Sequence, residues 1–302
     1  MTLDRTSWWW RRGRAGVVIF TSLLAAGVVA RPMQNAAWLP VKARQSELKL
    51  NDLGNNVGQG MLLGVFGGFR TVLADFVWLR AYSYWEQRDK ADLETMIYLA
   101  TTLDPRMVSF WDNGSGELAN DIAAYVNHDT DIPDNKKLAE YYKARQIQAE
   151  IALKFLDRGL QFNPGEYTLL KDEALLYDNN LREAARAAGH ESDESKYLAR
   201  AAEKWREAAE ADDSPFFAGR LYVRHLVRMG KKIEAYTYLT KMYPRLPADA
   251  PDAQKGVIWD WMIGLELNLN LPRDHNPRLA APPGWTPDEN VHDLAKLIDV
   301  DF

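Results

Sequence analysis

The stretch PFFAGRLYVRHLVRMGKKIEAYTYLTKMYPRLP, residues 215–247, predicts the fold of this chain more clearly than any other. Two segments with apolar residues at helical spacing flank the turn sequence MGK (229–231), and a proline stands at each end, Pro215 and Pro247. Proline ends a helix because it lacks the amide donor and its ring crowds the preceding turn. The stretch therefore predicts two antiparallel helices joined by a short turn.

The same punctuation recurs along the chain. A proline follows an apolar-periodic segment and precedes another in LDP, FNP, DSP and RLP, at residues 103–105, 162–164, 213–215 and 245–247. Alternating β-branched runs bounded by turn residues are missing, so the pattern predicts no sheet. We expect an all-α protein built from consecutive helix pairs.

These pairs resemble tetratricopeptide repeats, which are units of about 34 residues with small and aromatic residues at fixed positions. The residues that carry the resemblance are Ala74, Trp78, Ala81, Tyr84 and Ala100 in a first unit, Trp111, Ala152 and Gly159 in a second, Leu170, Ala174 and Tyr177 in a third, and Ala235 and Pro247 in a fourth. The resemblance implies an α-solenoid of about four helix pairs, closed by a capping helix in KGVIWDWMIGLELN, residues 255–268. We expect insertions in the second and third units, at about 127–145 and around AAGHESDES, residues 187–195.

The N-terminal segment predicts a membrane anchor. An arginine cluster precedes the uncharged run AGVVIFTSLLAAGVVA (15–30), and the candidate interfacial residues are Trp8, Trp9, Trp10, Arg11 and Arg12. Basic residues before such a run favour a cytoplasmic N-terminus. We expect a single-pass protein of the inner (cytoplasmic) membrane, with the rest of the chain periplasmic. The alternative is a signal peptide cleaved after VVA (28–30).

The expected organisation has four parts: a cytoplasmic stub with the anchor, a linker, a helical repeat domain, and a proline-rich tail with a short helix, at residues 1–31, 32–57, 58–271 and 272–302. In the tail, Thr286 as N-cap, Pro287 and Glu289 predict a helix that runs to about Ile298. The sequence leaves open whether this helix folds back on the repeats or binds a partner.

The stretch GQGMLLGVFGGFRTVLADFVWLRAYSYW (58–85) allows three interpretations. Its glycines have the wrong spacing for a phosphate loop, and its apolar part is too short for a second membrane span. We expect helices that lead into the first repeat, with a stripe of Gly60, Gly64 and Gly68. Arg70 and Asp75 are expected to form a buried structural pair, since so much of that helix is apolar. The segment also resembles parts of membrane-anchored bacterial repeat proteins.

Composition and motifs argue against an enzyme, a cofactor and a nucleic-acid partner. The chain has 302 residues, a formal charge of -5 and no cysteine. That charge does not suit nucleic-acid binding. His225 lies on an apolar helix face, where a core position is the expected role. Asp129, Asp131 and Glu140 fit three positions of a calcium loop, but aspartate stands where its glycine is required.

The sequence therefore predicts a scaffold that binds protein partners of the membrane or envelope. The candidate contact residues are large residues of first helices that stacking does not require: Arg80, Tyr82, Asn120, Tyr125, Lys171, Arg220 and Arg224. The alternative is a stable accessory subunit of a membrane-embedded enzyme, transport or secretion complex, with the anchor and glycine stripe packed on other membrane helices.

Overall fold

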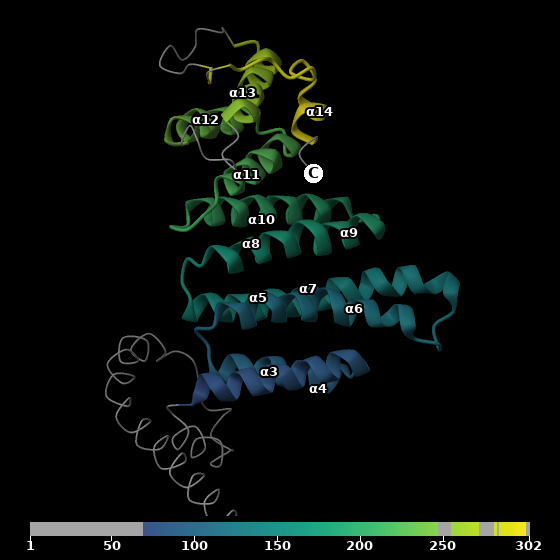
Figure 1. Cartoon of the computed structure of the whole chain (residues 1–302). Coiled ribbons are helices and arrows are strands. Elements are labelled where there is room, and N and C mark those ends of the chain that lie inside the picture. The colour runs from purple at the N-terminus through teal and green to yellow at the C-terminus, as the bar shows by residue number, and fades with distance from the viewer. Residues whose placement is uncertain (1–68, 247–254, 272–280, 283, 300–302) are drawn as a thin grey trace, which may run out of the picture. The chain divides into compact units, whose positions relative to one another are not determined.

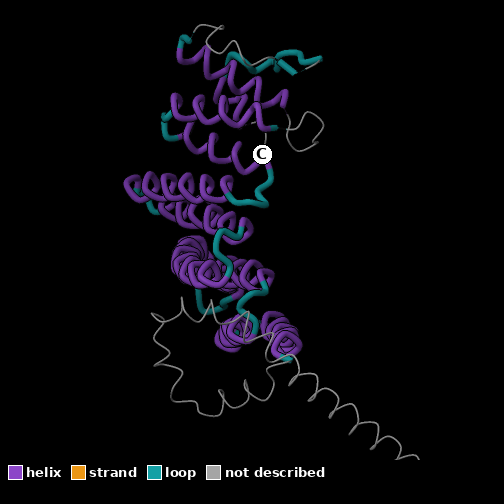
Figure 2. The backbone as a smooth tube through the Cα atoms, turned by 90° about the vertical axis from the view of Figure 1, so that its left-hand side faces the viewer, coloured by secondary structure: helices purple, strands orange, loops and turns teal. Residues whose placement is uncertain are grey.

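The protein is known from a computed structural model, which describes residues 69–246, 255–271, 281–282 and 284–299. All regular structure in these residues is helical, and they contain no strand (Figures 1 and 2), so the expected all-α class is confirmed. The chain divides into two compact units, residues 1–107 and 108–302.

The first unit contains a helix pair, α3 (Arg70–Gln87) and α4 (Lys90–Leu103). Small residues let the two helices approach closely: Ala74 and Ala81 are buried on α3, as is Ala100 on α4. Arg88 adopts a left-handed conformation in the turn between the helices. These three alanines line the contact between the two helices.

The second unit begins with a broken first helix and a long second one. Its segments are α5 (Val108–Gly116), the π-helical η3 (Glu117–Asp121), α6 (Ile122–Ala124), the 3₁₀ turn η4 (Tyr125–His128) and α7 (Asp134–Phe162). Of the expected insertion at 127–145, residues 129–133 form a loop and most of the rest forms the first turns of α7. The insertion thus mainly lengthens the pair.

Glycine at position 159 has a packing reason. A Cβ there would lie 2.9 Å from Cδ2 of Trp111, closer than real carbon contacts allow. The Trp111 ring is buried against Phe155, with ring centroids 4.6 Å apart. Position 159 therefore has room only for glycine, because the tryptophan lies directly over the helix backbone.

The next pair repeats this design. Its segments are α8 (Tyr167–Leu175), the π-helical η5 (Leu176–Arg182), α9 (Glu183–Ala187) and α10 (Glu191–Glu210). Gly189, at φ 73°, makes the turn between α9 and α10. The second expected insertion is therefore also helix: residues 187–195 form the end of α9, a tight turn and the start of α10.

The last elements are α11 (Phe216–Arg228), α12 (Lys232–Met242), the 3₁₀ turn η6 (Tyr243–Arg245), α13 (Lys255–Leu269) and α14 (Leu294–Asp299). Gly230, at φ 75°, makes the predicted turn between α11 and α12. In the second unit the helix pairs follow one another in chain order, and each packs on the next (Figure 1).

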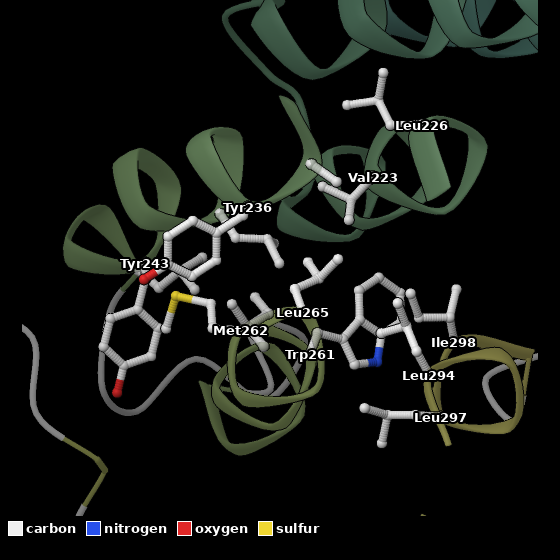
Figure 3. Packing of buried hydrophobic residues seen from close by; sticks show 14 residues of the cluster. Val223, Leu226, Tyr236, Tyr243, Trp261, Met262, Leu265, Leu294, Leu297 and Ile298 are labelled. Carbon is white, nitrogen blue, oxygen red and sulfur yellow. The ribbon is translucent and has the colours of Figure 1, made fainter. Parts of the chain in front are cut away.

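A large buried cluster lies at the C-terminal end and joins four helices (Figure 3). Trp261 and Leu265 of α13 lie between side chains of α11 and α12 on one side and Leu294, Leu297 and Ile298 of α14 on the other. A Cβ at Gly264 would lie 2.9 Å from Leu297, so α14 packs closely on α13 at that glycine. The tail helix therefore folds back on the chain.

The predicted start of the tail helix is wrong. The helix begins at Leu294 rather than after Thr286, and Asp293 caps it by accepting a hydrogen bond from the Lys296 amide at 3.3 Å. Residues 285–288 instead bind α13, since Trp285 Nε1 and the Asp288 amide both donate to Asp260, at 3.0 and 3.3 Å. Tertiary hydrogen bonds thus outweigh the local capping signal.

Several N-terminal predictions lie outside the described residues. They concern the anchor, the signal-peptide alternative, the linker and the glycine stripe, all within residues 1–68. No helix in the described ranges combines the length and the apolar character needed to cross a membrane.

Candidate functional site

The predicted contact residues of the first unit lie on an exposed face of α3. Tyr82 is 55% exposed and stacks on Trp85. Arg80 donates to the Tyr84 hydroxyl at 3.3 Å, and its guanidinium lies 4.7 Å from the centre of that ring. Both side chains are held in place by neighbouring aromatic rings.

An apolar row runs along the same exposed face of α3. Val72, Phe76 and Leu79 are 49%, 65% and 67% exposed. Their spacing of four and three residues places them on one side of the helix. Exposed large apolar side chains in a contiguous row are typical of a surface that binds another protein.

The expected buried pair of Arg70 and Asp75 is wrong for the aspartate. Asp75 lies on the exposed face, whereas Arg70 is half-buried and donates from Nη2 to the carbonyl of Thr102 on α4 at 3.3 Å. The five-residue spacing does not place the two residues on one helix face, so α4 reaches the arginine and solvent reaches the aspartate.

In the second unit the structure brings two of the predicted residues into polar contacts between first helices. Asn120 of η3 accepts a hydrogen bond at 2.9 Å from Asn180 of η5, which is buried. Lys171 of α8 lies between two carboxylates, 3.7 Å from Asp112 and 3.1 Å from Asp172. Tyr125, Arg220 and Arg224 are half-buried.

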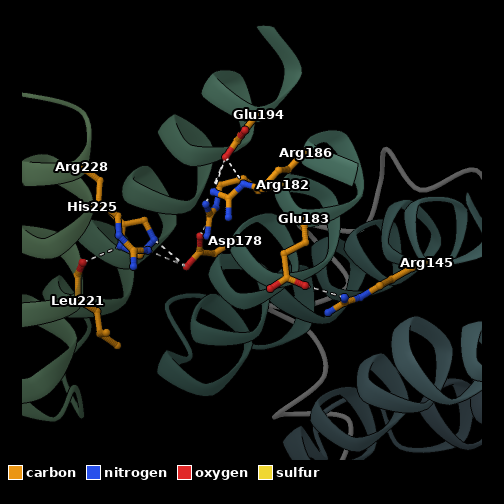
Figure 4. A network of polar contacts seen from close by, with 9 residues as sticks. All are labelled: Arg145, Asp178, Arg182, Glu183, Arg186, Glu194, Leu221, His225 and Arg228. Carbon is orange, nitrogen blue, oxygen red and sulfur yellow. Dashed lines mark hydrogen bonds and ion pairs between the residues drawn. The ribbon is translucent and has the colours of Figure 1, made fainter. Parts of the chain in front are cut away.

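The most extensive of these contacts centres on Asp178 in η5 (Figure 4). Its Oδ1 lies 2.5 Å from Nε of Arg182, and its Oδ2 lies 3.2 Å from Nε2 of His225 and 3.8 Å from Nη1 of Arg228. Burial alone would raise the pKa of Asp178. The hydrogen bonds and charges of His225 and Arg182 outweigh burial and hold that pKa well below its usual range.

His225 is a core residue, as its sequence position predicts, and is 1% exposed. Its Nδ1 lies 2.7 Å from the Leu221 carbonyl, and its Nε2 faces the Asp178 carboxylate. Both neighbours are hydrogen-bond acceptors, so the ring lies between the Leu221 carbonyl and the Asp178 carboxylate. His225 thus joins α11 to η5.

Arg182 extends the network to a third helix. It lies 3.5 Å from Glu194 of α10, which also accepts from Nε of Arg186 at 2.8 Å. A separate pair, Arg145 Nη1 to Glu183 Oε2 at 2.7 Å, links α7 to α9 (Figure 4). These contacts fix how consecutive helix pairs stack, so the network has a structural role.

Three carboxyl groups in first helices have pKa values raised to near neutral pH. Two of these side chains are buried and one is half-buried. Burial and the nearby Asp112 carboxylate raise the pKa of Asp172 to about 8, against the influence of Lys171. Burial raises the pKa of Glu173 to about 7 although Lys204 lies 3.0 Å away. Burial and the charge of Asp121 raise the pKa of Glu117 to about 7.

Within the described ranges, no group of three or more His, Asp or Glu side chains is arranged to hold a metal ion. At the weak calcium candidates, Asp129 accepts a hydrogen bond from the Asp131 amide at 2.9 Å, and Glu140 Oε2 lies 3.8 Å from Nζ of Lys143.

Sequence reasoning missed two features. The Asp178 network joins residues of η5, α10 and α11 that are far apart in the chain, and no local pattern marks them. The sequence also did not predict the pocket of about 410 Å³ between α13 and the tail. The signal for it was that α13 has large apolar residues on more than one face.

The described part of the chain thus defines an all-helical protein of paired helices with buried polar links between the pairs. Comparison with protein-family models, with curated proteins and with solved structures finds no match to this chain.

Proposed function

We propose that this chain is a scaffold of tetratricopeptide-like helix pairs that binds a protein partner. The proposal is supported by the order of packing, because each helix contacts mainly its neighbours in the chain, as in repeat arrays. It is also supported by the burial of Ala81, Ala152 and Ala174, which lie at the small positions of the repeat pattern.

The exposed row of Val72, Phe76 and Leu79 carries the proposal. An apolar row of this spacing suits a partner helix that lays its own apolar face along it. Asp75 and Arg80 flank the row with opposite charges, so the rim favours a partner with mixed charge over a strongly charged surface. We therefore assign the row to an amphipathic helix of another protein.

The test uses site-specific photo-crosslinking in cells that produce the whole chain. A photoreactive phenylalanine analogue replaces Phe76 in one variant and Leu138 in a control, and these two side chains are similarly exposed at 65% and 66%. A partner crosslinked at position 76 and not at 138 is then purified, and its affinity is measured.

Leu79→Ser should weaken that partner's binding at least tenfold, and Ile233→Ser should not. Leu79 and Ile233 are 67% and 71% exposed, so neither change disturbs the core. Equal crosslinking at 76 and 138, or equal affinity of the two serine variants, would refute the assignment of the row.

The second candidate function is a stable accessory subunit of a membrane-embedded complex. It shares the proposed inner-membrane anchor and periplasmic helical domain, and differs in the lifetime of the complex. After extraction in mild detergent, a subunit migrates in a complex of fixed composition, whereas a transient scaffold migrates alone. Sizing with light scattering separates the two.

A further inference from the structure

The proposed scaffold function assigns no role to the pocket between α13 and the tail. One wall is a single face of α13, and the other is formed by the returning tail. The lining residues are Trp259, Met262, Ile263, Glu266, Leu267, Ala281, Trp285, Pro287, Val291 and His292. A volume of about 410 Å³ falls within the range of small-molecule sites.

The walls of the pocket are held in place by buried contacts. Trp285 donates from Nε1 to Asp260 at 3.0 Å, and burial raises the pKa of that aspartate. The Trp285 ring meets the Trp259 ring edge to face, with centroids 6.4 Å apart. Val291, which closes another side, is buried. The pocket is thus formed before any ligand enters it.

One carboxylate gives this mostly apolar pocket its charge preference. Glu266 is half-buried, and its Oε1 accepts a hydrogen bond at 2.7 Å from the hydroxyl of Tyr236. That bond orients the carboxylate and leaves Oε2 for a ligand. The other titratable side chain of the lining is His292, which is exposed.

We propose that this pocket binds a small organic amine whose apolar body lies against the two tryptophans and whose ammonium group meets Glu266. Indole faces attract cations through the ring quadrupole, and a carboxylate in apolar surroundings strengthens that attraction. The Glu266 carboxylate would repel an anionic ligand, and no Lys or Arg among the lining residues would offset that repulsion. A neutral ligand would leave that carboxylate partly desolvated and unpaired.

The test compares three probes with the same phenyl body: 2-phenylethylamine, 2-phenylethanol and 3-phenylpropionate. Isothermal titration calorimetry of the whole chain measures each affinity at pH 7. The amine should bind at least tenfold more tightly than the alcohol, and the propionate should bind most weakly. If the alcohol binds as tightly as the amine, or the propionate binds best, the proposal is wrong.

Two variants locate the site. Glu266→Gln keeps the shape and an acceptor for Tyr236 but removes the charge, so the preference for amine over alcohol should fall to about one. Glu234→Gln removes an exposed carboxylate of α12, whose side chain is 57% exposed, and should leave the preference unchanged. A preference that survives in Glu266→Gln would place the amine elsewhere and overturn the proposal.

If Glu266→Gln lowers stability, the wild-type chain still tests the proposal, because the ratio of the amine and alcohol affinities is measured without any variant. The probes do not touch the α3 row, so failure here leaves the scaffold proposal intact. Failure of the crosslinking test likewise leaves the amine site intact.

Discussion

Replacement of Gly159 by alanine tests how the Trp111 ring sets the spacing between α5 and α7. The new methyl carbon would lie 2.9, 3.0 and 3.1 Å from three ring atoms of Trp111. The ring cannot move freely, because it is 1% exposed and packs on Phe155 and Phe162. The helix backbone or the ring must therefore shift.

Two opposing effects decide the magnitude. Overpacking of a core typically destabilises by about 1–3 kcal/mol, while alanine in place of glycine stabilises a helix by up to about 1 kcal/mol. The net loss should be about 1–2 kcal/mol in the free energy of unfolding. At about 2–4 °C per kcal/mol for a domain of this size, the melting temperature should fall by about 2–8 °C.

The matched control is Gly116→Ala in α5. A Cβ at that position meets nothing within 4 Å, so only the gain in helix propensity remains. The control should be more stable than the wild type by about 0.5–1 kcal/mol. Circular dichroism during urea and thermal unfolding measures both variants under the same conditions.

The reasoning would be refuted if Gly159→Ala were as stable as Gly116→Ala. A second check is the background of Trp111→Leu, which is itself destabilising but removes the ring atoms in question. In that background the loss caused by Gly159→Ala should shrink, because the two residues are in direct contact and their effects should not add.

Two predictions concern aspartates of the second unit. Asp172 has a pKa raised to about 8, so its native form holds a proton more firmly than the unfolded chain does, and the free energy of unfolding should fall as pH rises from about 4 to about 8. Asp172→Asn should flatten this dependence in urea titrations at pH 5 and pH 8, and an unchanged slope would contradict the assignment. Asp178 has a lowered pKa, so it stabilises the fold above about pH 4 and less at lower pH. Asp178→Asn leaves the charge of Arg182 without its carboxylate, and should cost about 3–5 kcal/mol at pH 7 and less near pH 3. An equal loss at both pH values would show that shape rather than charge is responsible.

Local signals in the sequence were sufficient for the helical class and for several positions within it. Gly230 lies in the turn between α11 and α12 because the turn needs a positive φ, which glycine adopts without strain. Small residues such as Ala81 and Ala100 are buried where two helices meet, and His225 lies in the core. These features depend on residues close in sequence or on helical periodicity.

The prediction that depended on competition between local and distant contacts, the start of the tail helix, was wrong. The tail capping signal at Thr286 gave way because Asp260 holds the backbone of Asp288 and the ring of Trp285. The expected insertions were placed without helix bounds: residues 134–145 begin α7, and residues 187–195 span the end of α9, a tight turn and the start of α10. Periodicity alone does not show where such a helix ends.

The sequence by itself determined that this chain would form paired helices, since apolar spacing and proline positions act over a few residues. Only the tertiary structure decided which polar groups meet. Asp178 reaches His225, and Glu266 lines one pocket with two tryptophans, through the packing of helices far apart in the chain. Such contacts have no sequence period, because they are set by the geometry with which whole helices stack.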